Sequence, residues 1–232
     1  MRQAMRSFLA LMISALLGAP EALAQRLGRD APFAQEINGF AADDKANPPP
    51  ACAYLFVGSS SFTLWESMAK DLSPRPIINR GFGGSHIRNV NAYFDRVVTP
   101  YKPRAIVFYA GENDIESGRP LPDLLADFQA FMGKKTQALG ATPVYFISVK
   151  PSPLRWTQRG DQAAFNDMVR AYGAGRTDLR FIDVVPDMLE NGRPKALFVE
   201  DGLHLNAAGY AIWTRDIAAA LDAPAPSRSP NC

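Results

Sequence analysis

The chain has 232 residues, of which 47% are hydrophobic, and its formal net charge at pH 7 is +2. A charge this close to balance does not favour nucleic acid or an anionic membrane surface as a partner. The length is sufficient for one large α/β domain with a substantial core.

The first segment has the three parts of a secretory signal peptide. Arg2 and Arg6 precede an apolar run over residues 8–17, and the small-x-small tripeptide Ala-Leu-Ala follows at residues 22–24. A membrane anchor is the alternative, but the run is short for a bilayer span and no cysteine follows it to carry lipid. The pattern therefore predicts that residues 1–24 are removed and that the mature protein is periplasmic or secreted. No later stretch is apolar enough to predict a membrane span.

Two stretches flank the predicted domain, which is expected to cover residues 52–222. Residues 25–51 show no clear period and end in three prolines, so we expect an extended arm wrapping the domain, or a linker. Residues 223–232 combine prolines with serines, which predicts a flexible tail.

Between these ends, short apolar runs alternate with helical patterns. This alternation predicts a five-stranded parallel sheet with helices on both faces, a three-layer α/β/α sandwich. Sites in such sheets form at the carboxyl ends of the strands. The predicted strands are residues 54–57, 76–79, 105–110, 143–149 and 179–182, and the predicted helices are residues 62–72, 86–101, 121–139, 162–172 and 206–221.

A run of small residues, from Gly58 to Ser61, follows the first predicted strand and precedes a helix. This geometry lifts a side chain above the sheet and leaves backbone N–H groups free, so a serine hydroxyl there could be a nucleophile. A helix N-cap is the alternative reading of the same serines.

Two further polar clusters follow the second and third predicted strands. The first has three glycines between Gly81 and Gly84, which predicts exposed N–H groups. A phosphate cradle is possible there, but the spacing matches neither dinucleotide-binding nor P-loop patterns. In the second, the Asn113 amide can donate to a developing oxyanion, or it can form an Asx turn.

The fourth cluster pairs Asp201 with His204 in a loop that opens the last predicted helix. An aspartate at this spacing can accept from one ring nitrogen and leave the other to take a proton. The chain has 2 histidines, and His86 with His204 makes a poor zinc set. We therefore expect no metal and no cofactor.

The four clusters, in this order, resemble the SGNH hydrolase superfamily, the GDSL-type lipases and esterases. That family carries Gly-Asp-Ser after its first strand, a glycine after the second, Gly-x-Asn-Asp after the third and Asp-x-x-His near the C-terminus. The matching residues are Ser60, Gly84, Asn113, Asp201 and His204, within a resemblance that spans about residues 54–221. This chain departs from the pattern at Ser59, where the family has aspartate.

The resemblance implies a flavodoxin-like SGNH hydrolase fold and a serine esterase mechanism. Ser60 would attack an ester carbonyl, His204 would act as the base and Asp201 would orient it. The backbone N–H groups of Ser60 and Gly84 and the Asn113 side chain would hold the oxyanion. Ser61 would begin the helix and cap it.

The substrate is expected to be a short-chain acyl ester, carried by a small molecule or a carbohydrate. No long inserted lid is visible, which disfavours a lipase acting on long chains. Trp156, in the loop over residues 151–160 with Arg155 and Arg159, either stacks on a sugar ring or packs over the edge of the core. The alternatives are an acyltransferase that moves an acyl group to a carbohydrate hydroxyl, a catalytically inactive carbohydrate-binding module, and a structural exported domain.

Cys52 and Cys232 are the two cysteines of the chain. An exported compartment permits a disulfide between them. The composition of the tail instead favours a buried free Cys52 and a disordered Cys232.

Overall fold

The computed structural model describes residues 32–232, so the predicted signal peptide lies outside the described residues. The chain divides into two compact units, Met1–Ala46 and Asn47–Cys232. The described part of the first unit contains helix α3 (Ala34–Ala46). The extended conformation predicted for residues 25–51 is therefore wrong for these 13 residues. The stretch is rich in alanine, a strong helix former, but it lacks the apolar period from which the other helices were predicted.

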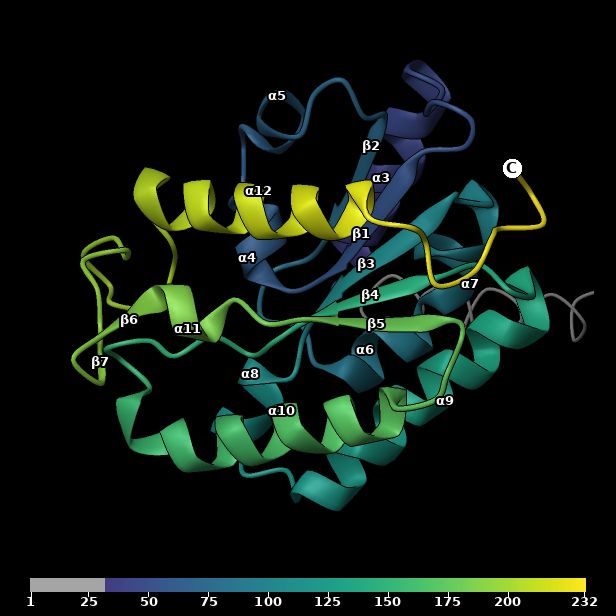
Figure 1. Ribbon diagram of the computed structural model, residues 1–232. Helices are drawn as coiled ribbons and strands as arrows, with labels where there is room; N and C mark the ends of the chain where they lie inside the picture. Colours follow the sequence, from purple (N-terminus) through teal and green to yellow (C-terminus); the bar gives the residue numbers. More distant parts are fainter. Residues whose placement is uncertain (1–31) are drawn as a thin grey trace, which may run out of the picture. The chain divides into compact units, whose positions relative to one another are not determined.

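The second unit is built on a five-stranded parallel sheet, with the strand order β2-β1-β3-β4-β5 (Figure 1). The predicted α/β fold class is confirmed. The strands are β1 (Tyr54–Gly58), β2 (Ile77–Gly81), β3 (Ala105–Tyr109), β4 (Val144–Ile147) and β5 (Leu179–Ile182), and a separate antiparallel pair is formed by β6 (Leu189–Glu190) and β7 (Arg193–Pro194).

Three long helices lie where the sequence predicted them: α9 (Leu121–Leu139), α10 (Arg159–Gly173) and α12 (Ala207–Asp222). The predicted helices over residues 62–72 and 86–101 are each broken into short pieces. Pro100 lies in η1 and prevents α7 from continuing through residue 100, because proline cannot donate the helical hydrogen bond. The short elements are α4 (Ser60–Thr63), α5 (Met68–Asp71), α6 (Ile87–Ala92), α7 (Phe94–Val97), α8 (Glu112–Glu116), α11 (Val185–Met188) and the 3-10 helices η1 (Thr99–Tyr101) and η2 (Trp156–Gln158).

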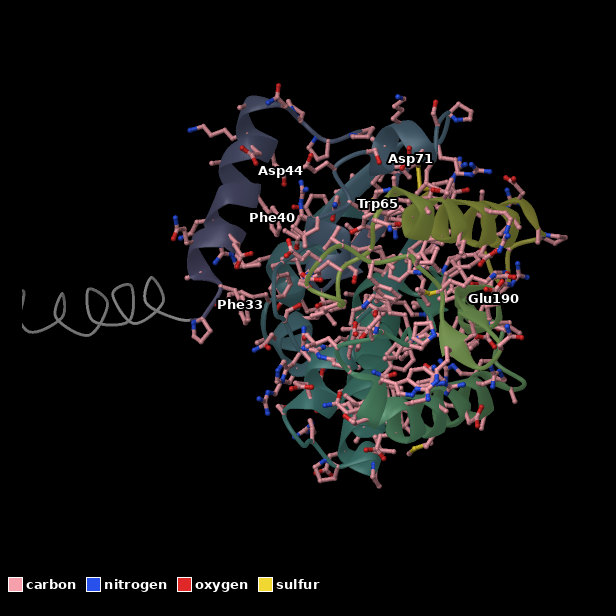
Figure 2. All side chains as sticks on the ribbon, turned by 90° about the vertical axis from the view of Figure 1, so that its left-hand side faces the viewer. Phe33, Phe40, Asp44, Trp65, Asp71 and Glu190 are labelled. Atoms are coloured by element: carbon pink, nitrogen blue, oxygen red, sulfur yellow. A yellow bond between two sulfur atoms is a disulfide. The ribbon has the colours of Figure 1, made fainter. Side chains whose placement is uncertain are left out.

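Helices cover both faces of the sheet (Figure 1). On the face of α4 and α12, Phe62 and Trp213 pack edge to face with their ring centroids 6.1 Å apart, and Trp65 Nε1 donates to Asp71 Oδ2 at 2.8 Å (Figure 2). On the opposite face, Phe108 of β3 lies 4.6 Å from the Phe131 ring of α9. Each fully buried aromatic side chain contributes about 1.5–3 kcal/mol through removal of apolar surface from water.

Strand β1 lies between β2 and β3, so the β1–β2 connection runs to one side of β1 and the β2–β3 connection crosses back to the other. Parallel sheets bind their ligands at the carboxyl ends of the strands where the strand order reverses in this way. The segments that follow β1, β2 and β3 therefore converge at one edge of the sheet. Three of the four polar clusters lie in these segments. The fourth lies between β7 and α12, and its His204 reaches the same edge, where Nε2 lies 2.9 Å from Ser60 Oγ.

The C-terminal tail is fastened to the domain. Cys232 forms a disulfide with Cys52, with the two Cα atoms 5.5 Å apart. Ser229 Oγ donates to the carbonyl oxygen of Pro103 at 2.8 Å. The favoured expectation of two free cysteines is therefore wrong, because composition alone does not show that the tail ends beside the residue that precedes β1.

Candidate active site

Gly58 turns the chain sharply at the end of β1. Its φ is +148°, and a Cβ atom there would lie 1.9 Å from the carbonyl oxygen of Tyr109. That oxygen accepts the N–H of Ser59 at 3.0 Å. Helix α4 begins at Ser60, with Ser59 in the N-cap position and without a side-chain cap bond, so the expected capping role of Ser61 is wrong. Ser60 is thereby presented at the carboxyl edge of the sheet.

Ser60, His204 and Asp201 form one chain of hydrogen bonds. His204 Nε2 lies 2.9 Å from Ser60 Oγ, and His204 Nδ1 lies 2.6 Å from Asp201 Oδ2. Asp201 Oδ1 also accepts the backbone N–H groups of Leu203 at 2.8 Å and His204 at 2.9 Å. The Asp201 carboxylate therefore stabilises the turn that contains it and orients the His204 ring so that Nε2 faces the Ser60 hydroxyl.

The same contacts set the charge of Asp201. Burial raises its pKa, but the hydrogen bonds from the His204 ring and from two backbone N–H groups outweigh this and lower the pKa to about 2. Asp201 is therefore ionised at neutral pH.

The loop after β2 brings Gly84 to the same edge. Its φ is +73°, a conformation that favours glycine. The Gly84 N–H has no acceptor among residues 32–232. Ser60 N–H is the first of helix α4, where no intrahelical acceptor exists. Ser85 Oγ donates to the Gly58 carbonyl oxygen at 2.9 Å, which ties this loop to the end of β1.

Asn113 reaches the site from the first turn of α8, not from an Asx turn. Its Nδ2 donates to Ser59 Oγ at 2.9 Å and to the Ser85 carbonyl oxygen at 3.1 Å. Both amide hydrogens therefore have acceptors within the protein. Ser59, which is 3% exposed, thus uses its hydroxyl to bind the neighbouring polar cluster.

Arg155 is a residue of the site to which sequence reasoning assigned no role. It donates to Asn113 Oδ1 at 3.0 Å, while Glu112 lies 3.8 Å and Glu116 3.4 Å from its guanidinium. The guanidinium fixes which side of the Asn113 amide points toward Ser59. The two glutamates, four residues apart and so on one face of a helix, were the available sign that a cation would lie against α8.

Asp114 holds the start of α6, the helix that follows the glycine loop. The side chain is fully buried, and its two carboxylate oxygens accept the N–H of Ile87 at 3.2 and 3.3 Å, at the start of α6. Burial raises the pKa of Asp114 to about 6. His86 Nδ1 lies 3.8 Å from this carboxylate, and burial lowers the pKa of the imidazole.

A buried ion pair lies beneath α8. Lys150 Nζ and the Tyr109 hydroxyl both donate to Glu112 Oε2 at 2.7 Å. Burial lowers the pKa of Lys150, although its contact with Glu112 opposes this change. Burial also raises the pKa of Tyr109. The network anchors the helix that carries Asn113.

Within residues 32–232, no group of three or more His, Cys, Asp or Glu side chains is placed to hold a metal ion. In that same part of the chain, no helix is long and apolar enough to cross a membrane.

A parallel α/β sheet with a serine, histidine and aspartate hydrogen-bonded at its carboxyl edge has the arrangement of an acyl-transfer hydrolase. The profile of the GDSL-like Lipase/Acylhydrolase family matches residues 53–212. The chain belongs to this family, and the resemblance inferred from the four clusters is confirmed. It is accordingly a hydrolase of the ester-cleaving acylhydrolase class.

Solved structures share the fold at low sequence identity. A GDSL-like lipase from Bacteroides thetaiotaomicron matches with a TM-score of 0.68 and 21% identity, covering 80% of this chain and 97% of that one. A Streptococcus pneumonia protein provisionally assigned as a platelet activating factor matches with a TM-score of 0.71 and 18% identity, covering 87% and 97%. A catalytic mutant of an acetylxylan esterase from Geobacillus stearothermophilus matches with a TM-score of 0.59 and 15% identity, covering 73% and 93%. No curated protein sequence matches this chain.

Proposed function

We propose that the protein is an exported serine esterase that hydrolyses short-chain acyl esters, with Ser60 as nucleophile, His204 as general base and Asp201 as the residue that orients it. The observation that carries the proposal is the pair of contacts at His204, 2.6 Å to Asp201 and 2.9 Å to Ser60. A base must lie within hydrogen-bond reach of the proton it removes, and this histidine does.

In the first half of the reaction, Ser60 Oγ attacks the ester carbonyl carbon while His204 Nε2 takes the hydroxyl proton. His204 then returns that proton to the leaving alcohol, and the acyl group stays on Ser60. In the second half, His204 removes a proton from water, the water oxygen attacks the acyl-enzyme, and Ser60 leaves with the proton as the acid is released. Asp201 remains ionised throughout and stabilises the imidazolium.

The negative charge on the carbonyl oxygen is stabilised by the N–H groups of Ser60 and Gly84 and by Asn113. Because both Asn113 hydrogens have protein acceptors, the substrate oxygen must take the place of one of them. Of the two acceptors, Ser59 Oγ is the one that the substrate oxygen can replace more easily. The Ser59 hydroxyl can rotate and donate a hydrogen bond instead of accepting one, whereas the Ser85 carbonyl oxygen can only accept. Removal of one oxyanion donor typically costs 10²–10³ in kcat.

A short acyl group on a carbohydrate is the substrate we propose. The acetylxylan esterase among the similar folds supports this class, although it is only 15% identical. Trp156 is half-buried in η2, with the guanidinium of Arg193 5.5 Å and that of Arg159 5.8 Å from its ring. Its exposed part offers an aromatic surface on which a sugar ring could stack.

Export is proposed on two grounds. The pattern of residues 1–24 is that of a signal peptide. The disulfide between Cys52 and Cys232 is of the kind that persists in oxidising compartments.

Hydrolysis of 4-nitrophenyl esters of graded chain length, and of acetylated xylan, tests the proposal. We expect the highest kcat/KM for acetate and a loss of several orders of magnitude in kcat for Ser60→Ala, as is typical when a triad nucleophile is removed. Ser61→Ala is the matched control, because that hydroxyl lies outside the hydrogen-bond chain, and it should stay within about tenfold of the wild type. Product analysis with a polysaccharide acceptor present separates hydrolysis from acyl transfer.

A further inference from the structure

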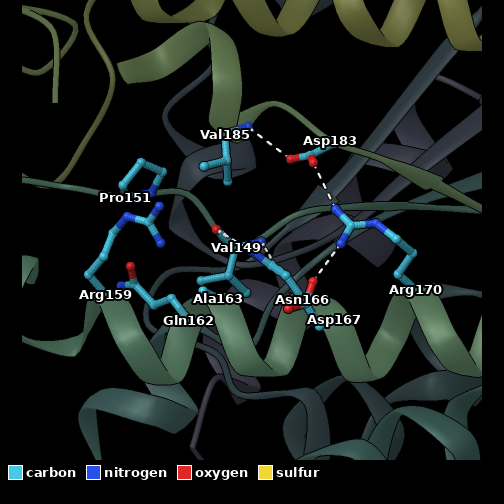
Figure 3. A pocket seen from close by; sticks show the side chains of 10 residues that line it. All are labelled: Val149, Pro151, Arg159, Gln162, Ala163, Asn166, Asp167, Arg170, Asp183 and Val185. Carbon is cyan, nitrogen blue, oxygen red and sulfur yellow. Dashed lines mark hydrogen bonds and ion pairs between the residues drawn. The ribbon is translucent and has the colours of Figure 1, made fainter. Parts of the chain in front are cut away.

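A cavity of about 140 Å³ lies beyond the ends of β4 and β5, against the first turns of α10 (Figure 3). Its apolar wall is formed by Val149, Pro151, Ala163 and Val185. Arg159 and Gln162 line the same cavity from α10. None of these residues belongs to the hydrogen-bond chain of Ser60, His204 and Asp201.

The Gln162 amide in this cavity has no partner. The residue is 2% exposed, and neither Nε2 nor Oε1 makes a hydrogen bond within the described part of the chain. Asn166, one turn further along α10, carries the same group fully satisfied, with Oδ1 accepting the Val149 N–H at 2.8 Å and Nδ2 donating to the Val149 carbonyl oxygen at 3.0 Å. Buried amides are nearly always paired, so the unpaired one beside this cavity leaves a donor and an acceptor for a polar group bound there.

The charged side chains that line the cavity are two arginines and two aspartates, whose charges sum to zero but are unevenly placed. Arg170, on the far side, is neutralised by Asp167 at 2.6 Å and Asp183 at 2.8 Å, as the dashed lines of Figure 3 show. Arg159 has no carboxylate within ion-pair distance among residues 32–232, and its guanidinium lies 5.8 Å from the Trp156 ring centre. In Figure 3 the Arg159 guanidinium and the Gln162 amide lie on the same side of the cavity, below Pro151.

We propose that this cavity is a binding site for a carboxylate, separate from the catalytic serine. The Arg159 guanidinium supplies two parallel N–H donors, the geometry that matches a carboxylate. Gln162 Nε2 adds a donor, and Oε1 accepts a hydroxyl of a ligand that carries one. The size of the cavity suits a small acid such as acetate or the carboxylate end of a sugar acid.

Titration of the ¹⁵N-labelled full-length protein tests this site. The probes are sodium acetate and sodium glucuronate, with sodium chloride at equal ionic strength and glucose as controls. We expect saturable shifts of the Gln162 side-chain NH₂ signals and of the Ala163 backbone amide with the carboxylates and not with the controls. Tighter binding of glucuronate identifies a sugar acid as the ligand, and equal or tighter binding of acetate identifies a small acid.

Three variants sharpen the test. Arg159→Gln should weaken carboxylate binding at least tenfold, whereas Arg104→Gln, the same change at the opposite edge of the sheet, should leave it unchanged. Gln162→Met should weaken binding as seen at Ala163 and should not lower the Tm of the ligand-free protein, because it removes an unpaired buried amide. Shifts that chloride reproduces, the absence of saturation, or full affinity in Arg159→Gln would overturn the proposal. A lower Tm for Gln162→Met would also overturn it, since the amide would then be satisfied without a ligand.

Discussion

Ser59 occupies the position where the family pattern has aspartate, and its hydroxyl accepts from Asn113 Nδ2 at 2.9 Å. The sequence showed the departure but not its consequence, because Ser59 and Asn113 are 54 residues apart and meet only when β1 and β3 pair. Serine at position 59 therefore keeps an oxygen acceptor beside Asn113, the proposed oxyanion donor. It does so without the ionised carboxylate that the family aspartate would place there.

We predict that Ser59→Ala lowers kcat about tenfold with the fold intact, because Ser59 no longer positions the Asn113 amide before the substrate oxygen takes the place of the Ser59 hydroxyl. Ser59→Asp should retain measurable activity, since it restores the family residue. Steady-state kinetics with 4-nitrophenyl acetate measures both effects. A loss in Ser59→Ala as large as that in Ser60→Ala would contradict the supporting role.

The contact of Arg155 with Asn113 could not be predicted from residue patterns in the sequence. Its place in the loop over residues 151–160 could be read from the sequence, but its 3.0 Å bond to Asn113 Oδ1 depends on how that loop folds back over α8. The proposed site residues could be selected from the sequence because they lie in short motifs: Ser60, Gly84 and Asn113 after strands, and Asp201 with His204 before the last helix. Arg155 lies in no motif.

Arg155→Met should lower kcat by about 10–100-fold with KM nearly unchanged, because the misplaced Asn113 amide matters mainly where oxyanion charge develops. Arg155→Lys should recover part of the loss, since it keeps a donor. Arg193→Met is the matched control: Arg193 also lies near Trp156 but makes no contact with Asn113. Equal kinetic effects of Arg155→Met and Arg193→Met would assign the effect to Trp156 instead.

Among the secondary-structure elements, the strands and the long helices could be predicted from apolar runs and amphipathic periods. The short helices could not be predicted in this way. Asn206 caps α12, because its side chain accepts the Gly209 N–H at 3.0 Å. The start of α6 is held in two ways: Asn89 Oδ1 accepts the His86 N–H at 2.9 Å, and Asp114 of α8 accepts the Ile87 N–H. Only the first of these contacts is local in the sequence; the second could not be predicted from neighbouring residues.

Asp114 gives this contact between elements a pH dependence. Its pKa is about 6 in the folded protein against an ordinary value of 3.8, so the folded state binds the proton more tightly than the unfolded state. Its contribution to stability is therefore fully present below pH 4 and is lost as the pH rises through about 6. The loss amounts to at most about 3 kcal/mol.

Asp114→Asn, which keeps an oxygen acceptor for Ile87, should remove this dependence. We expect the free energy of unfolding of the wild type, relative to the variant, to fall between pH 4 and pH 6.5, as measured by urea denaturation. A difference that stays constant or rises with pH over this range would show that the buried carboxyl does not titrate in this way.

For the whole molecule, the disulfide closes a loop between residues separated by 180 positions, at the edge of the sheet opposite the proposed active site. The tail was predicted to be flexible because its composition is typical of mobile segments. Composition does not encode where a chain end arrives, and here three long-range contacts, from Ser227, Ser229 and Cys232, hold the tail in place.

Replacing Cys52 and Cys232 by serine should lower the free energy of unfolding by up to about 5 kcal/mol, the chain-entropy value for a loop of this length. The activity at 25 °C should be unchanged, because the crosslink is remote from Ser60. Thermal unfolding with and without reductant, alongside ester hydrolysis, measures both quantities. An unchanged Tm in the double variant would mean that the disulfide does not stabilise the fold.

Covalent labelling shows which of three consecutive serines is the nucleophile, which we propose to be Ser60. The full-length protein is treated with a fluorophosphonate, digested, and the modified residue is located by peptide sequencing. We expect one adduct, on Ser60, that is lost in Ser60→Ala and strongly slowed in His204→Ala, while Ser61→Ala labels at the wild-type rate. An adduct on Ser59 or Ser61, or labelling that persists in Ser60→Ala, would contradict it.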